Sequence, residues 1–138
     1  MADNTFALEV ITPEKILFRD EAQFAVVPEI TGELGVLKNH APVLAALKTG
    51  VLRYTDTGGT VHKMAVNGGF MEVVYNEVKV LTETAERAED IDVARAMAAR
   101  DRAMQRLQAR DDGVNVTRAE AALQRSISRL KAAGKYQQ

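Results

Sequence analysis

Arginine side chains in the C-terminal part of the chain recur at helical spacing. On a helix that turns ~100° per residue, Arg118, Arg125 and Arg129 project within about 40° of one another. Arg95 and Arg102 are seven residues apart and share a line on a preceding helix. Guanidinium groups that converge from two helices can hold a polyphosphate through charge-assisted, bidentate hydrogen bonds. The spacing therefore indicates a candidate phosphate-binding surface.

Two other interpretations of these arginines stay open. They can pair with acidic side chains on a solvated face, for which Asp90, Asp92, Asp101 and Glu120 are available. They can also bind nucleic acid, although no aromatic residues are interleaved with them and the first part of the chain is acidic. We expect no nucleic-acid partner.

No convincing catalytic or metal motif accompanies the arginines. His40 has no Ser or Cys nucleophile near it in sequence, and His62 sits at an alternating strand position. The glycines near Gly32 and Gly68 have neither the Walker spacing nor a Gly-x-Gly-x-x-Gly run. The chain has no cysteine and two histidines, which argues against a closed zinc site. We expect no catalytic residue, no metal and no required cofactor.

The chain changes composition at Glu86. Residues 1–85 carry seven Lys/Arg against eleven Asp/Glu, whereas residues 86–138 carry eleven against eight, within a total net charge of −1. All three prolines and seven of the nine glycines lie in the first part, and nine of the eleven arginines lie in the second. A chain of 138 residues is too short for two large domains. We predict one domain over residues 1–85 and a smaller one over residues 86–138.

Short apolar runs fill the first part, and the breaks between them are mostly Gly, Pro, Asn or Asp. They predict eight to ten strands in an antiparallel β-sandwich or barrel, because no crossover helix fits between them. No run approaches the ~20 apolar residues of a membrane helix, and the N-terminus lacks the pattern of a signal peptide. We expect a soluble chain on the cytoplasmic side of the membrane.

The second part predicts two helices packed as an antiparallel hairpin. Asp90 is the expected cap of the first helix, with Asp92 in its first turn, and Thr117 with Glu120 forms a capping-box pattern for the second. The expected ends are Asp111-Asp112-Gly113 and Gly134. The apolar stripes run through Val93, Met97, Met104 and Leu107, with Ala96 and Ala103 beside them, and through Ala119, Leu123, Ile127 and Leu130. Because such a hairpin is marginal alone, we expect it to be the element that changes partners.

Several motifs along the whole chain resemble those of the ε subunits of F-type ATP synthases. They are Thr31–Leu37, His40-Ala41-Pro42, Leu47–Arg53, Val66–Val73, Ala85–Ala96 and Arg118-Ala119-Glu120. One departure is Asn39, where the family usually has Gly. The resemblance implies a ten-stranded β-sandwich followed by a two-helix domain.

The resemblance also implies a role in the central stalk of the rotary complex. The sandwich would bind the γ subunit and the c-ring, with Glu33 near the c-ring and His40, Ala41 and Pro42 near γ. The helices would either fold down against the sandwich or extend toward the catalytic α and β subunits and block ATP hydrolysis. The subunit would not be catalytic itself. It would meet the membrane only through the complex, at the cytoplasmic face of a bacterial membrane or the stromal face of a thylakoid.

Some bacterial members of this family bind ATP in the folded-down form. Their motif Ile/Leu-Asp-x-x-Arg-Ala is matched by Ile91, Asp92, Arg95 and Ala96, and their preceding Glu falls on Glu86. The resemblance assigns the phosphate-binding arginines to Arg102, Arg118, Arg125 and Arg129. ATP is then a regulatory ligand, although Asp92 could equally serve only to start a helix. A different class of function, a free-standing nucleotide-binding sensor or adaptor without a rotor partner, also stays open.

Overall fold

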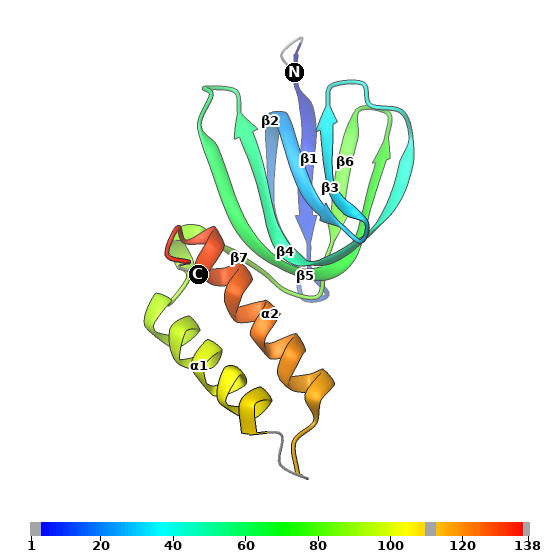
Figure 1. Ribbon diagram of the computed structural model, residues 1–138. Helices are drawn as coiled ribbons and strands as arrows, with labels where there is room; N and C mark the ends of the chain where they lie inside the picture. The colour runs from blue at the N-terminus through cyan, green and yellow to red at the C-terminus, as the bar shows by residue number, and fades with distance from the viewer. Residues whose placement is uncertain (1–3, 110–112, 137–138) are drawn as a thin grey trace.

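Strands occupy the first part of the chain and helices the second, as the change in apolar period predicts. The computed structural model describes residues 4–109 and 113–136 (Figure 1). The elements are β1 (Phe6–Ile11), β2 (Ile16–Glu29), β3 (Gly32–Leu37), β4 (Val43–Asp56), β5 (Val61–Val74), β6 (Glu77–Leu81), β7 (Ala85–Arg87), the 3₁₀ turn η1 (Ala88–Asp90), α1 (Val93–Ala109) and α2 (Val116–Ala132). A β-sandwich followed by a helical hairpin is therefore confirmed.

The sandwich contains seven described strands, so the expectation of ten is wrong. The reason is that β2, β4 and β5 are each fourteen residues long and join apolar runs that the sequence presents as separate strands. In β5, Gly68 and Gly69 have φ values of +72° and +104°, and the β4–β5 pairing skips Gly68 and Lys48. Glycines that read as chain breaks are thus bends within continuous strands.

Five of the strands close into a barrel in the order β1-β6-β5-β4-β2, because β1 also pairs with β2. Strand β3 extends the sheet from β2, and β7 pairs with β5. Strands β1 and β6 are parallel, so a purely antiparallel sheet was also a wrong prediction. A parallel pair needs a long connection between its two strands. Here strands β2 to β5 form that connection between β1 and β6, so no crossover helix is required.

Alternating side chains of the strands fill the barrel interior. Leu8 and Val10 of β1 and Val78 and Val80 of β6 are at most 1% exposed and belong to one apolar cluster. Because the interior is packed with side chains, candidate binding sites have to lie on the outer surface of the sandwich or against the helices.

Helix α1 begins two residues later than the cap at Asp90 predicts. Asp90 ends the turn η1, and the side chain of Asp92 caps α1 by accepting a hydrogen bond from the backbone N–H of Arg95 at 3.0 Å. The predicted end of this helix at Asp111 and Asp112 lies outside the described residues.

Helix α2 is capped by Asn115, so the capping box of Thr117 and Glu120 is a wrong prediction. The Asn115 Oδ1 atom accepts a hydrogen bond from the backbone N–H of Arg118 at 3.0 Å. The predicted stop at Gly134 is confirmed: its φ is +73°, and the next residue donates a backbone hydrogen bond to the Leu130 carbonyl at 2.8 Å.

The two helices pack through small residues of α1. Ala96 and Ala103 are 2% and 1% exposed, whereas Met97 and Met104 are 37% and 42% exposed. The buried stripe therefore runs through the alanines and not through the methionines. Short alanine side chains let the two helices approach closely, and this approach turns the longer methionines toward solvent.

Helix α2 lies against β4 and β5, and α1 packs on α2 (Figure 1). Ala65 of β5, Ile91 and Ala132 of α2 form a small buried cluster between the sandwich and the hairpin. The predicted domain boundary at Glu86 falls inside β7, which remains paired with β5. None of the described helices is both long and apolar enough to cross a membrane.

Candidate functional site

A cleft of about 430 Å³ lies where β7, α1 and α2 meet. Its walls are Thr84, Glu86, Asp92, Arg95, Ala96, Ala99, Arg102 and Arg129. Six of the nine residues predicted for ATP binding are therefore brought together. They come from three elements, so the cleft is complete only while the hairpin is docked on the sandwich.

The two carboxylates of the cleft are both held in place. Glu86 in β7 accepts a hydrogen bond from Arg129 Nε at 2.7 Å, which joins the sandwich to α2. The Asp92 side chain is fixed by the hydrogen bond through which it caps α1. These contacts present carboxylate oxygens at the cleft wall, where they can accept hydrogen bonds from an amino group or a sugar hydroxyl.

Arg95 and Arg102 lie on one face of α1, two turns apart, and both are exposed. Within the described ranges neither arginine forms an ion pair. The structure therefore does not show Arg95 and Arg102 paired with acidic side chains on a solvated face. With Arg129 the cleft has three guanidinium groups against two carboxylates, which suits an anionic ligand.

Three of the predicted residues are not part of the cleft wall. Arg125 lines a small adjoining cavity with Glu86 and Arg129. Ile91 is buried in the cluster between sandwich and hairpin and serves as an anchor. Arg118 lies at the far end of the hairpin, in a separate cavity with Arg106.

The sequence reasoning missed two residues of the cleft. Ala99 follows Asp92, Arg95 and Ala96 at helical spacing, so the period of α1 could have identified it. Thr84 precedes β7 in an irregular segment, and no pattern in the sequence marks it as part of the cleft.

The residues predicted for rotor contacts lie at opposite ends of β3. Glu33 is in the first half of the strand and forms an ion pair with Arg53 at 2.7 Å. His40, Ala41 and Pro42 follow the strand and are separated from Glu33 by about 13 Å of strand and by the turn after Leu37. The two sets can therefore contact different partners at the same time.

The turn before His40 also explains the departure at Asn39. Asn39 has a φ of +58°, a conformation that glycine adopts freely and that asparagine tolerates better than most residues. Its backbone N–H donates to the Asn76 side chain at 2.7 Å, so the turn is tied to the loop between β5 and β6.

A stacked polar network extends from Tyr54, a buried residue of the sandwich core, to the partly exposed His62. Tyr54 stacks on His62 and donates a hydrogen bond to Asp20 at 3.0 Å, and His62 Nε2 lies 2.7 Å from Asp56 Oδ2. Burial, with the Asp20 hydrogen bond adding to it, raises the pKa of Tyr54 to about 12. The hydrogen bond from His62, followed by those from backbone N–H groups, lowers the pKa of Asp56.

Comparisons with known proteins agree on one family over most of the chain. The family model for the β-sandwich domain of the ATP synthase delta/epsilon chain matches residues 5–88, and the model for its long α-helix domain matches residues 89–134. The ATP synthase epsilon chain of Syntrophomonas wolfei is 58% identical over 112 residues, which cover 81% of this chain and 82% of the relative.

A second relative and a solved structure extend the match. The ATP synthase epsilon chain of Carboxydothermus hydrogenoformans is 55% identical over 135 residues, covering 98% of this chain and 99% of the relative. A chain in the mitochondrial ATP synthase structure of Euglena gracilis superposes with a TM-score of 0.81 at 25% identity, covering 94% of this chain and 81% of that one.

Proposed function

This chain belongs to the ATP synthase delta/epsilon family and is a non-catalytic rotor subunit of an F-type ATP synthase, and from this premise we propose how its two parts act. The sandwich attaches the subunit to γ and to the c-ring, and the hairpin regulates ATP hydrolysis. The subunit is peripheral and reaches the membrane only through the complex, at the cytoplasmic or stromal face.

Exposed apolar side chains on the sandwich support the attachment. Phe70 and Leu81 pair across β5 and β6 and are 54% and 46% exposed, and Leu44 on β4 is 70% exposed. Adjacent exposed apolar side chains are typical of protein contact surfaces. A pull-down with purified γ tests this: we expect Phe70→Asp to weaken capture. Failure of the unmodified chain to bind γ would favour the free-standing sensor instead.

The small contact between hairpin and sandwich supports regulation by movement. Besides the Glu86–Arg129 ion pair, the buried contact centres on Ala65, Ile91 and Ala132, which is little apolar surface for holding two helices. The hairpin can therefore separate and extend toward the catalytic α and β subunits. Deleting residues 88–138 should raise ATP hydrolysis by the assembled complex while rotation stays coupled. Unchanged hydrolysis would contradict a regulatory hairpin.

ATP is the proposed regulatory ligand of the cleft between β7, α1 and α2. The observation that carries this proposal is the convergence of Arg95 and Arg102 from α1 with Arg129 from α2 beside two fixed carboxylates. Because the cleft requires the docked hairpin, ATP would stabilise that state.

Ligand at ten times its dissociation constant contributes about 1.4 kcal/mol, whereas reversing a 1:99 equilibrium needs about 5.5 kcal/mol. ATP can therefore change which hairpin state predominates only where the docked and separated states are already close in free energy.

Calorimetry with a matched pair of arginine variants tests the site. Arg102→Ala removes a guanidinium of the cleft wall and should weaken ATP binding by about ten-fold or more, as expected for a charge-assisted contact. Arg118→Ala removes an exposed arginine of the same hairpin outside the cleft and should leave the affinity unchanged. Equal weakening by both variants would place ATP elsewhere, and no heat with the unmodified chain at millimolar ATP would remove the proposal. Arg125→Ala, at the adjoining cavity, should give an intermediate loss.

A further inference from the structure

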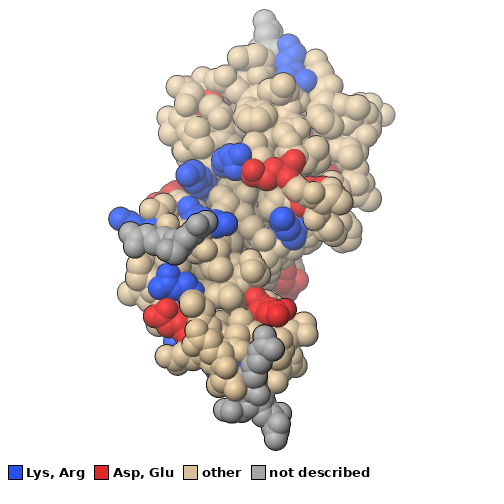
Figure 2. Space-filling model, in the orientation of Figure 1, with Lys and Arg blue, Asp and Glu red and all other residues tan. Residues whose placement is uncertain are grey.

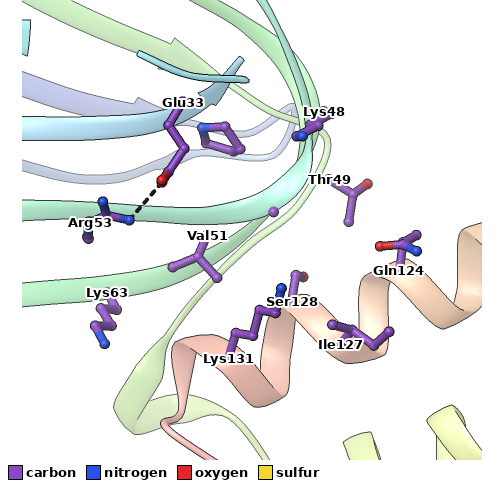
Figure 3. Close-up of a pocket in the computed structure, with 12 residues that line it drawn as sticks. Glu33, Lys48, Thr49, Val51, Arg53, Lys63, Gln124, Ile127, Ser128 and Lys131 are labelled. Atoms are coloured by element: carbon purple, nitrogen blue, oxygen red, sulfur yellow. Dashed lines mark hydrogen bonds and ion pairs between the residues drawn. The ribbon is translucent and has the colours of Figure 1, made fainter. Parts of the chain in front are cut away.

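A second and larger hollow lies between the sandwich and α2. It has a volume of about 550 Å³, and Figure 3 shows its two walls: strands β3, β4 and β5 on one side and α2 on the other. None of its lining residues belongs to the wall of the cleft between β7, α1 and α2, the proposed ATP site and here called the nucleotide cleft. We name it the α2 groove, defined here by Lys48, Arg53, Lys63, Lys131 and Glu33.

The α2 groove concentrates positive charge on an acidic domain. The first 85 residues contain seven Lys/Arg against eleven Asp/Glu, yet Lys48, Arg53 and Lys63 all line this one hollow. Lys131 adds a fourth cation from α2. On the face shown in Figure 2, basic side chains gather where the sandwich meets the helices. The only acidic residue among the lining residues is Glu33.

The cations of the α2 groove are not neutralised by the described part of the protein. Glu33 is already paired with Arg53 at 2.7 Å. Lys48, Lys63 and Lys131 form no ion pair with any acidic side chain in the ranges that the structure describes. Lys131 lies over the Tyr136 ring at 5.1 Å, a contact that keeps its charge. Like charges around a shared hollow repel one another, so an anion bound there would relieve the repulsion.

We propose that the α2 groove binds a small ligand with two or more linked phosphate groups. Lysine ammonium groups bind phosphate as mobile point charges, and their positions on both walls suit an extended polyphosphate better than a single phosphate. The volume lies in the range of small-molecule sites, and Val51 and Ile127 add an apolar part to the walls. Such a ligand bridges the sandwich and α2 and so favours the docked hairpin. The proposal does not depend on ATP binding at the cleft.

Calorimetry of the full chain with pyrophosphate tests the site. We expect a binding event in the α2 groove that weakens as salt rises, because the contacts are electrostatic. Lys48→Gln and Lys131→Gln, one on each wall, should each raise the dissociation constant about five-fold, and Lys15→Gln, an exposed lysine outside the groove, should change it less than about two-fold. Glu33→Gln removes the acidic group and should tighten binding.

Two further arms separate this site from other sources of binding. Arg102→Ala, in the nucleotide cleft, should leave pyrophosphate binding unchanged; loss of binding in that variant would assign the heat to the cleft and overturn the proposal. ATP added to Arg102→Ala shows whether the linked phosphates of a nucleotide also enter the α2 groove. Competition between ATP and pyrophosphate in this variant would support a groove that recognises linked phosphates from either source. No heat at about 10 mM pyrophosphate, or equal weakening by Lys15→Gln and the groove variants, would refute a specific site.

Discussion

Docking of the hairpin on the sandwich should depend strongly on Ile91. Its side chain is 8% exposed and packs with Ala65 and Ala132 at the junction of the two parts. Ile91→Ala removes three carbon atoms, which at ~0.8 kcal/mol each weakens docking by about 2.4 kcal/mol. Since each 1.4 kcal/mol is tenfold, the ratio of separated to docked hairpin should rise about 50-fold.

A single introduced thiol measures this change, because the chain has no cysteine of its own. Ser128 on α2 is 5% exposed and lines cavities facing the sandwich, so Ser128→Cys creates a thiol that reagents reach mainly when the hairpin separates. Its labelling rate should rise about 50-fold in the Ile91→Ala background. Met97→Ala, on the exposed face of α1, is the matched control and should leave the rate within about two-fold.

Two results of the labelling experiment would refute this reasoning. An increase below about five-fold in Ile91→Ala would mean that contacts other than the apolar cluster hold the hairpin. Equal labelling rates at Ser128→Cys and at Ala22→Cys, which is buried in the sandwich core, would mean that the hairpin separates only when the whole chain unfolds.

Two further predictions concern the sandwich. Gly69→Ala should lower the free energy of unfolding by about 3 kcal/mol or more, because Gly69 has a φ of +104° and an added Cβ would overlap the Leu81 carbonyl. Urea titration measures this loss. Gly59→Ala, where an added Cβ meets nothing, is the control and should lower the free energy of unfolding by less. Because burial raises the pKa of Tyr54 to about 12 in the folded chain, the free energy of unfolding should fall as pH rises from 10 to 12. Tyr54→Phe should flatten that fall, and an unchanged slope would contradict the assignment.

Much of the cleft between β7, α1 and α2 could be predicted from the sequence, because its residues repeat along single elements. Asp92, Arg95 and Arg102 follow the period of α1, and the family motif adds Glu86. Arg118 shows the limit of this reasoning: it shares a helical face with Arg129 but lies about three turns away along α2, in another cavity. Angular position on a helix says nothing about distance along its axis.

The sequence also predicted the order of strands and helices, since the change from short apolar runs to helical stripes is a local property of the chain. It did not predict that the runs join into three long strands, because the bends at glycines such as Gly68 are stabilised by pairing with distant strands. Nor did it predict that alanines, and not Met97, face the partner helix, because that depends on how closely two helices approach.

The arginine-rich helical region was evident from composition and spacing alone. Only the tertiary structure placed Glu86 beside Arg129 and brought Lys48, Lys63 and Lys131 around one groove. These residues are far apart in sequence and lie on different elements, so no period connects them. Their convergence follows from the path of the chain, which is set by closure of the barrel and by docking of α2 on β4 and β5.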